Sequence, residues 1–238
     1  MRVKYLLLFI GLGLGTVSGH AFTLTPMSTT LDPKGNGSAK SFQMENESSN
    51  RVAFQITLLT RDMDENGKET NQPAADLFTV FPPQGIIAPG QSQTVRLVWK
   101  GQANLTNELA YRLLAEELPV NFTPETNKAQ IKVLLRYMAA VYVRPKNAKP
   151  KLQVTSFIQT ETNTCVMTVT NAGNAHQPLI DPALTLTDAR GQIQKIPSGQ
   201  ILSIAGQNIL AKHTRRFALT LPTDFKETNY QAQLTANE

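Results

Sequence analysis

The sequence predicts an all-β protein made of two immunoglobulin-like β-sandwiches in tandem, and three observations support this prediction. Short runs rich in Val, Ile, Thr and aromatic residues recur along the chain and are separated by turns containing Pro, Gly, Asn and Asp. Apolar residues at the spacing of an amphipathic helix are nearly absent. The chain has 238 residues, which is too long for one minimal sandwich of about 100 residues and suits two.

The first 21 residues are predicted to be a secretory signal peptide. Arg2 and Lys4 precede an apolar run over residues 5–17, and small residues follow up to Ala21. The run has roughly 13 residues, whereas a membrane-spanning helix needs about 20. We therefore expect export, with the mature chain beginning near Phe22.

The first sandwich is predicted to occupy residues 22–145. Within it, seven segments have the composition and alternation of strands: Phe22–Leu24, Ser41–Asn46, Arg51–Thr60, Phe78–Phe81, Thr94–Trp99, Tyr111–Leu118 and Gln130–Val143. Turns are expected between them, including Asp64-Glu65-Asn66-Gly67 and Pro82-Pro83-Gln84-Gly85.

The second sandwich is predicted to occupy residues 146–238, after a polar, basic segment with two prolines at 144–151. Its expected strands are Leu152–Thr160, Thr164–Asn171, Leu184–Thr187, Ile193–Pro197, Gln200–Ile204, Thr214–Leu221 and Tyr230–Leu234. The chain has one cysteine, Cys165, so it cannot form an intramolecular disulfide. We expect Cys165 to be buried and stability to come from the two cores.

The last predicted strand of the first sandwich, Gln130–Val143, is the segment most relevant to function. Its odd positions are all apolar or aromatic, which places one continuous apolar ridge on one face. Two interpretations remain open. In the first, the core of the sandwich covers the whole ridge. In the second, the N-terminal part of the ridge, with Ile131, Val133 and Leu135, lies at a sheet edge and pairs with another polypeptide.

Several segments occur in an order and spacing that resemble a known family. They are Phe22–Pro26, Phe78–Pro83, Ile86–Gln91, Gln93–Leu97, Tyr111–Pro119, the long strand and its terminus Val141–Pro145. With them, the chain resembles the periplasmic pilus-assembly chaperones of the chaperone–usher pathway (PapD-like) over essentially its whole mature length.

The resemblance implies a periplasmic chaperone that stabilises pilus subunits by lending them a β-strand and delivers them to an outer-membrane usher. Ile131, Val133, Leu135 and Tyr137 match the donor strand whose side chains enter the subunit. The expected partners are fimbrial subunits and the usher, with self-association possible when no subunit is bound. The short polar loop before the strand resembles the short-loop branch of the family.

One departure from the family concerns the terminal carboxylate of the subunit. Better-known members hold it with two basic residues, and the matching positions here are Ser28 and Ala140. The resemblance therefore implies a different anchor, for which Arg112 and Arg136 are the candidates, since arginine meets a carboxylate with two parallel hydrogen bonds. An anchor of this kind would resemble the archaic branch.

Other functions are disfavoured by the sequence. No catalytic constellation is recognised, and His176 and His213 lack metal-ligand spacing, so we expect no enzyme activity, no cofactor and no metal. The net charge is only +5 and the basic residues are scattered, so nucleic-acid binding is not expected. The alternative function is a secreted structural or adhesive β-sandwich component of the fibre itself.

Overall fold

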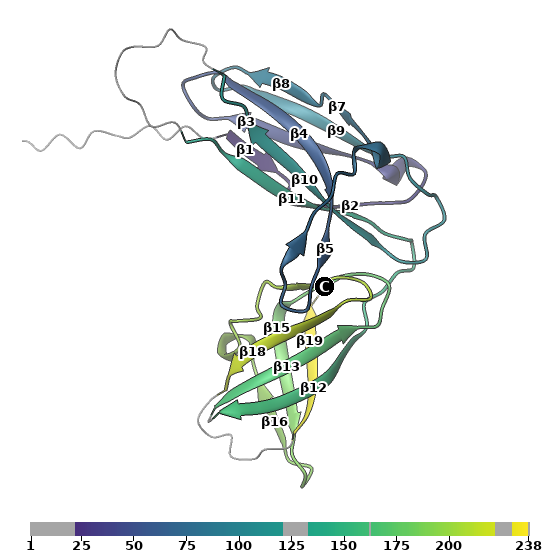
Figure 1. Ribbon diagram of the computed structural model, residues 1–238, viewed down its shortest axis with the longest axis vertical. Coiled ribbons are helices and arrows are strands. Elements are labelled where there is room, and N and C mark those ends of the chain that lie inside the picture. Colours follow the sequence, from purple (N-terminus) through teal and green to yellow (C-terminus); the bar gives the residue numbers. More distant parts are fainter. Residues whose placement is uncertain (1–21, 121–132, 162, 222–229, 238) are drawn as a thin grey trace, which may run out of the picture.

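The computed structural model describes residues 22–120, 133–161, 163–221 and 230–237. The predicted signal peptide and Ile131 lie outside these ranges. The described residues form strands, turns and three short 3₁₀ helices, which confirms the all-β prediction. None of the helices in this part of the chain has the length and hydropathy needed to cross a membrane. Two β-sandwiches lie end to end along the long axis of the molecule (Figure 1).

The first sandwich consists of two sheets, in which all neighbouring strands but one pair are antiparallel. One sheet has the order β1 (Phe22–Thr25), β3 (Ala39–Asn46), β9 (Ser92–Trp99) and β7 (Phe78–Phe81). The other has the order β2 (Ser28–Leu31), β11 (Arg136–Val143), β10 (Leu109–Glu117), β4 (Val52–Thr60) and β8 (Gln84–Ile87), with β2 and β11 parallel. The 3₁₀ helices η1 (Asn36–Ser38) and η2 (Ala75–Leu77) precede β3 and β7.

Alternating inward side chains from both sheets make the core of the first sandwich. Leu113 and Ala115 on β10 are fully buried, and so are Ala139 and Val141 on β11. The period of two that predicted these strands therefore also predicts which side chains face the opposite sheet. Because the core includes most of β11, the interpretation that the domain covers its own ridge holds from Ala139 onward.

The second sandwich contains a sheet of β12 (Leu152–Glu161), β13 (Thr164–Asn171) and β18 (Thr214–Thr220), and a sheet of β16 (Ile193–Ile196), β15 (Ile180–Thr187) and β19 (Gln231–Asn237). A short pair, β14 (Gln177–Pro178) and β17 (Asn208–Ile209), lies beside them, and the 3₁₀ helix η3 covers Ser198–Gln200. Cys165 is buried in this core, as expected.

A small hairpin connects the two sandwiches in addition to the chain itself. Strands β5 (Asp62–Met63) and β6 (Glu69–Thr70) extend from the end of β4 toward the second sandwich (Figure 1). Its turn is the predicted one, since Gly67 donates to the Asp64 carbonyl. Gly67 has φ +87°, a backbone conformation that favours glycine, and a Cβ there would lie 2.3 Å from Nη2 of Arg215 in the second sandwich, so a larger residue would also displace that guanidinium.

The hairpin holds the second sandwich through main-chain and side-chain bonds. Arg216 on β18 donates its backbone N–H to Glu65 O at 2.6 Å, and its guanidinium pairs with the Glu65 carboxylate at 3.0 Å. His213 contacts Asp62 at 2.7 Å. Because β18 is an edge strand of its sheet, the hairpin covers part of that edge.

The structure corrects two of the expected strands. The strand expected at Gln130–Val143 begins at Arg136 within the described residues, because its neighbour β10 ends at Glu117 and Pro119 then lacks an N–H to pair. The expected strand Gln200–Ile204 is a series of turns. Ile201 and Ile204, three residues apart, are both buried, and each donates its N–H three residues back.

Six short strands were not expected from the sequence. The first half of β8 lies where a turn was predicted, and β2, β5, β6, β14 and β17 were not predicted either. The boundary between residues 145 and 146 remains a prediction.

Candidate functional site

The candidate partner-binding edge is the start of β11 and the segment before it. On one side, β11 pairs with β10 along its whole length, and Glu117 N–H extends this ladder to the Leu135 carbonyl. On the other side, β2 pairs only with residues 140–143. Among the described residues, no strand lies beside the outer edge of residues 133–139, so main-chain groups of a further strand could pair there.

The side chains along this edge become more exposed toward its N-terminal end. Tyr137 is partly buried, stacks edge-on against Phe22 and donates its hydroxyl to the Phe22 carbonyl. Leu135 is partly buried against the same core, whereas Val133 is 65% exposed. Ile131, the fourth predicted donor residue, lies outside the described residues. The predicted donor positions therefore extend from the sandwich core to an uncovered apolar side chain.

Ser28 and Ala140, the positions at which the resemblance expects basic residues, form one row across three strands with the candidate anchor Arg112. Ala140 pairs with Ser28 on one side and with Arg112 on the other, so their side chains lie on the same face of the sheet. Met63 of the hairpin and Leu210 of the second sandwich cover Ala140. The row thus has a single cationic side chain, Arg112, one strand away from the position at which the resemblance expects a basic residue.

Arg112 belongs to a group of two arginines that hold one carboxylate. It donates to Glu69 Oε2 through Nε at 2.9 Å and to Oε1 through Nη2 at 2.5 Å. Arg61, which follows β4, donates to Glu69 Oε1 through Nε at 2.9 Å and places Nη2 2.8 Å from the same oxygen. Arg61 also donates to the Tyr142 hydroxyl at 2.7 Å. We call Arg61, Arg112 and Glu69 the arginine–carboxylate group.

Arg136, the second predicted anchor, lies elsewhere. It begins β11, pairs across the strands with Glu116 at 2.8 Å, and its side chain is 64% exposed. The structure therefore does not bring Arg112 and Arg136 together. Arg136 is a solvated charge beside the exposed apolar edge, whereas Arg112 lies at the junction of the two sandwiches.

A buried ion group fixes the same junction. Glu108, whose side chain is 1% exposed, accepts hydrogen bonds from the backbone N–H of His176 at 2.9 Å, from the His176 ring and from Arg144. The His176 ring stacks on Tyr142 with centroids 3.6 Å apart. Burial alone would raise the pKa of Glu108, but the hydrogen bonds and charge of His176 and the Arg144 bond hold that pKa below its ordinary value.

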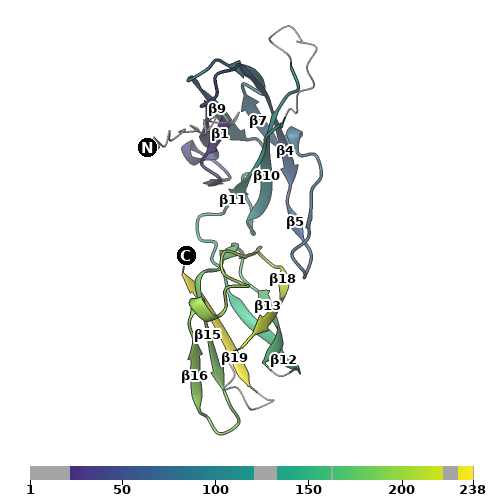
Figure 2. The ribbon, with the colours of Figure 1, turned by 90° about the vertical axis from the view of Figure 1, so that its left-hand side faces the viewer.

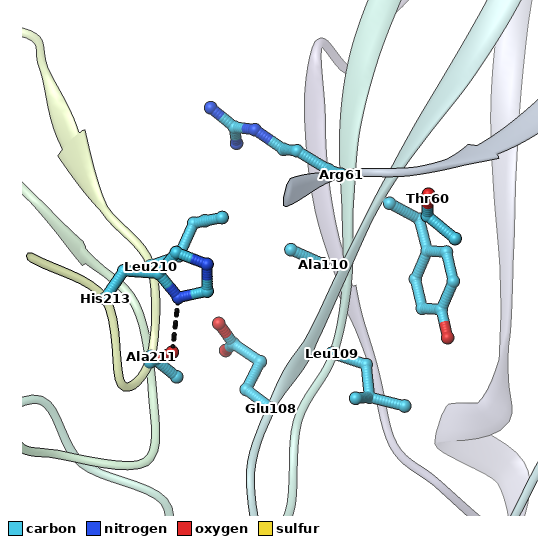
Figure 3. A pocket seen from close by; sticks show the side chains of 9 residues that line it. Thr60, Arg61, Glu108, Leu109, Ala110, Leu210, Ala211 and His213 are labelled. Carbon is cyan, nitrogen blue, oxygen red and sulfur yellow. Dashed lines mark hydrogen bonds between the residues drawn. The ribbon is translucent and has the colours of Figure 1, made fainter. Parts of the chain in front are cut away.

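A pocket of about 230 Å³ lies between the sandwiches, beside the arginine–carboxylate group. Figure 3 shows Arg61 at one end and Glu108 at the other, with Leu210, Ala211 and His213 of the second sandwich on the facing wall. The pocket thus combines one cationic end, one anionic end and apolar walls. In the described part of the chain, no group of three potential metal ligands is present.

Sequence reasoning missed Arg61, Glu69 and Glu108. Glu69 and Arg112 are 43 residues apart, and Glu108 and His176 are 68 residues apart, so no local pattern links them. The available signal was a charged residue directly after a strongly apolar strand, which Arg61 is, since a charge there lies at the end of the sheet.

Comparison with known proteins gives a consistent result. The sequence family described as pili and flagellar-assembly chaperone, PapD N-terminal domain, matches residues 23–149. No curated protein sequence matches the chain closely enough to add to this.

Solved structures with the same fold include the class 5 fimbriae chaperone CfaA, with 17% identity, TM-score 0.58, and coverage of 92% of this chain and 100% of that one. A chain of the Salmonella enterica SafA pilin–SafB chaperone complex has 14% identity and TM-score 0.58, covering 84% and 85%. A chain of the archaic CsuC–CsuE chaperone–tip subunit complex of Acinetobacter baumannii has 16% identity and TM-score 0.53, covering 84% and 90%.

Proposed function

This chain belongs to the pili and flagellar-assembly chaperone family, and from that premise we propose that it is a periplasmic chaperone that lends a β-strand to fibre subunits. The subunit pairs with the outer edge of β11 and the segment before it. The complex is then delivered to an outer-membrane usher. Related structures include complexes of a chaperone with a pilin and of a chaperone with a tip subunit, which supports the same class of partner.

The observation that carries the proposal is the free outer edge of residues 133–139, with an apolar residue at its exposed end. An unpaired edge with exposed apolar side chains is a hazard for a protein that acts alone and a binding surface for one that pairs with a partner. Val133 and Leu135 occupy alternate positions of this segment, as side chains that fill pockets in a partner strand pair do.

The exposed fraction sets the energy that Val133 can contribute. Full burial of a valine side chain is worth about 1.5–3 kcal/mol. Since 65% of Val133 is exposed, its burial by a subunit contributes about 1–2 kcal/mol, or about 5- to 30-fold in affinity. Removal of this side chain should therefore weaken a subunit complex measurably without affecting the core of the chaperone.

The test is co-expression with an exported fibre subunit. We expect a one-to-one complex by size-exclusion chromatography with the wild type, and a yield reduced at least about fivefold with Val133→Asp. The matched control is Ile193→Asp, which places the same charge at a residue that is 66% exposed on β16 of the second sandwich. Equal loss in both variants, or no loss in Val133→Asp, contradicts strand donation by this edge.

We further propose that Arg112 holds the terminal carboxylate of the subunit. Its place in one row with Ala140 and Ser28 supports it over Arg136, which is exposed and paired with Glu116. Arg112→Ala should lower the yield of complex, while the chaperone itself still unfolds cooperatively on heating. If Arg112→Ala and Arg136→Ala both leave the yield unchanged, neither residue is the anchor.

A further inference from the structure

We propose that Glu69 is an internal occupant of a carboxylate site formed by Arg61 and Arg112, and that the terminal carboxylate of a partner chain displaces it. This inference rests on the proposed function, because it concerns how the same junction admits a subunit. It adds a second arginine to the site, and it assigns the β5–β6 hairpin a competitive role.

The geometry around Glu69 is that of a carboxylate held as a ligand. Both of its oxygens are bonded, with contacts of 2.5–2.9 Å to four nitrogens of two guanidinium groups. Bidentate guanidinium–carboxylate pairing is the arrangement with which arginine recognises a carboxylate, whichever chain supplies it. Tyr142 receives a further Arg61 N–H and so fixes the orientation of that side chain.

The two arginines are held by the framework, while Glu69 is held by the hairpin. Arg112 lies in the middle of β10, and Arg61 follows β4 with its backbone N–H bonded to Ala110. Glu69 lies on β6, a strand of two residues that pairs only with the two residues of β5. Few main-chain bonds must therefore change for the Glu69 side chain to leave.

Access and charge also suit an exchange. The Glu69 and Arg112 side chains are 21% and 17% exposed, whereas Arg61 is 6% exposed, so a chain end would approach the group from the side of Arg112 and Glu69. Arg61 also lies at one end of the pocket of about 230 Å³ (Figure 3). Replacing one carboxylate with another leaves the charge of the group unchanged. This avoids the cost of leaving two desolvated arginines without an anion.

The electrostatics of Glu69 agree with this geometry. Burial alone would raise the pKa of Glu69, but the Arg112 hydrogen bond and the charges of Arg61 and Arg112 hold it below the ordinary value. Glu69 is therefore ionised under all physiological conditions and competes as an anion. A tethered competitor acts at an effective concentration in the millimolar range or above, so it raises the apparent Kd of any external carboxylate.

The experiment uses the full mature chain and a small probe. N-acetylglycine carries a free carboxylate, and N-acetylglycinamide is the same molecule without it. Each is titrated into the wild type, Glu69→Gln and Glu65→Gln while the Nε–Hε NMR resonances of Arg61 and Arg112 are followed. Glu65→Gln is the matched control, because it removes the same charge from the same hairpin at a site that faces Arg216.

We expect Glu69→Gln to bind N-acetylglycine at least about tenfold more tightly than the wild type. Glu65→Gln should bind as the wild type does, and N-acetylglycinamide should move neither arginine resonance. Equal or weaker binding of N-acetylglycine by Glu69→Gln overturns the proposal, because Glu69 would then support the arginines and not occupy their site.

Two further readouts keep the outcome decisive. If Glu69→Gln does not fold, saturating N-acetylglycine in the wild type should raise the pKa of the Glu69 carboxyl, followed by ¹³C NMR, toward its ordinary value. An unchanged pKa with the probe bound overturns the proposal. If the probe moves no arginine resonance in any variant while Val133→Asp still lowers the yield of the subunit complex, the carboxylate site is rejected and strand donation stands.

Discussion

Removal of the Glu108 carboxylate is the most direct test of how the two sandwiches are held together. Glu108 accepts three hydrogen bonds at the junction, two from His176 and one from Arg144, and its side chain is 1% exposed. Breaking a buried ion pair by removing one partner costs about 3–5 kcal/mol. Arg144 is 33% exposed and regains water, so we expect Glu108→Ala to cost about 3 kcal/mol, the lower end of that range.

The matched control is Glu116→Ala on β10, the strand that Glu108 directly precedes. Glu116 also pairs with an arginine, but the side chains of Glu116 and Arg136 are 29% and 64% exposed. An exposed pair of this kind contributes about 0–1 kcal/mol. The two substitutions remove the same groups, so the difference in the free energy of unfolding isolates the effect of burial.

Urea unfolding followed by the fluorescence of Trp99 measures this difference. Trp99 is the single tryptophan of the chain and is buried in the first sandwich, so it reports the unfolding of the unit that carries both glutamates. We expect Glu108→Ala to be less stable than Glu116→Ala by about 2 kcal/mol or more. If the two variants agree within about 0.5 kcal/mol, the buried junction does not stabilise the protein as argued.

Two further predictions concern titration and thiol reactivity. Burial alone would raise the pKa of Glu108, but the contacts with His176 and Arg144 outweigh it and lower this pKa. The stability that the Glu108 carboxylate contributes is therefore present above the ordinary glutamate pKa and is lost as the pH falls through the lowered value. The wild type should therefore lose more unfolding free energy than Glu108→Gln between about pH 6 and about pH 3, and parallel curves would contradict this. Burial raises the pKa of the Cys165 thiol, so a thiol reagent at neutral pH should label it only after unfolding; labelling of the native protein at the unfolded rate would show that it is accessible.

The strands that could be predicted from the sequence are those with a long alternating pattern. Thr164–Asn171 has the predicted bounds, since buried side chains alternate along all eight of its residues. Phe78–Phe81 has only four residues but also has the predicted bounds, because three of them are apolar. Strand β2, also of four residues, has one apolar side chain, Leu31, and the arms of the hairpin have two residues each, so none of these shows a pattern. Strand β8 contains Gly85, which packs against Phe54 and reads as part of a turn when the partner strand is unknown.

The candidate site could be predicted in part. The alternation of Val133, Leu135 and Tyr137 was visible because it is local. The arginine–carboxylate group was not, because Arg61, Arg112 and Glu69 come from three elements that only the fold brings together. The sequence offered Arg112 as one of two candidate anchors, and the strand register pairs it directly with Ala140, the position at which the resemblance expects a basic residue.

The two-fold attachment of the sandwiches limits how the molecule can bend. The covalent link at 144–151 and the β5–β6 hairpin lie on opposite sides of the junction (Figure 2), and Asp62 and Glu65 of the hairpin bond to His213 and Arg216 of the second sandwich. With one connection on each side of the junction, the two sandwiches cannot rotate freely about either of them. Rotation of one sandwich about the covalent link requires the contacts between the hairpin and the second sandwich to break first, so the angle between the two sandwiches stays fixed while these contacts hold.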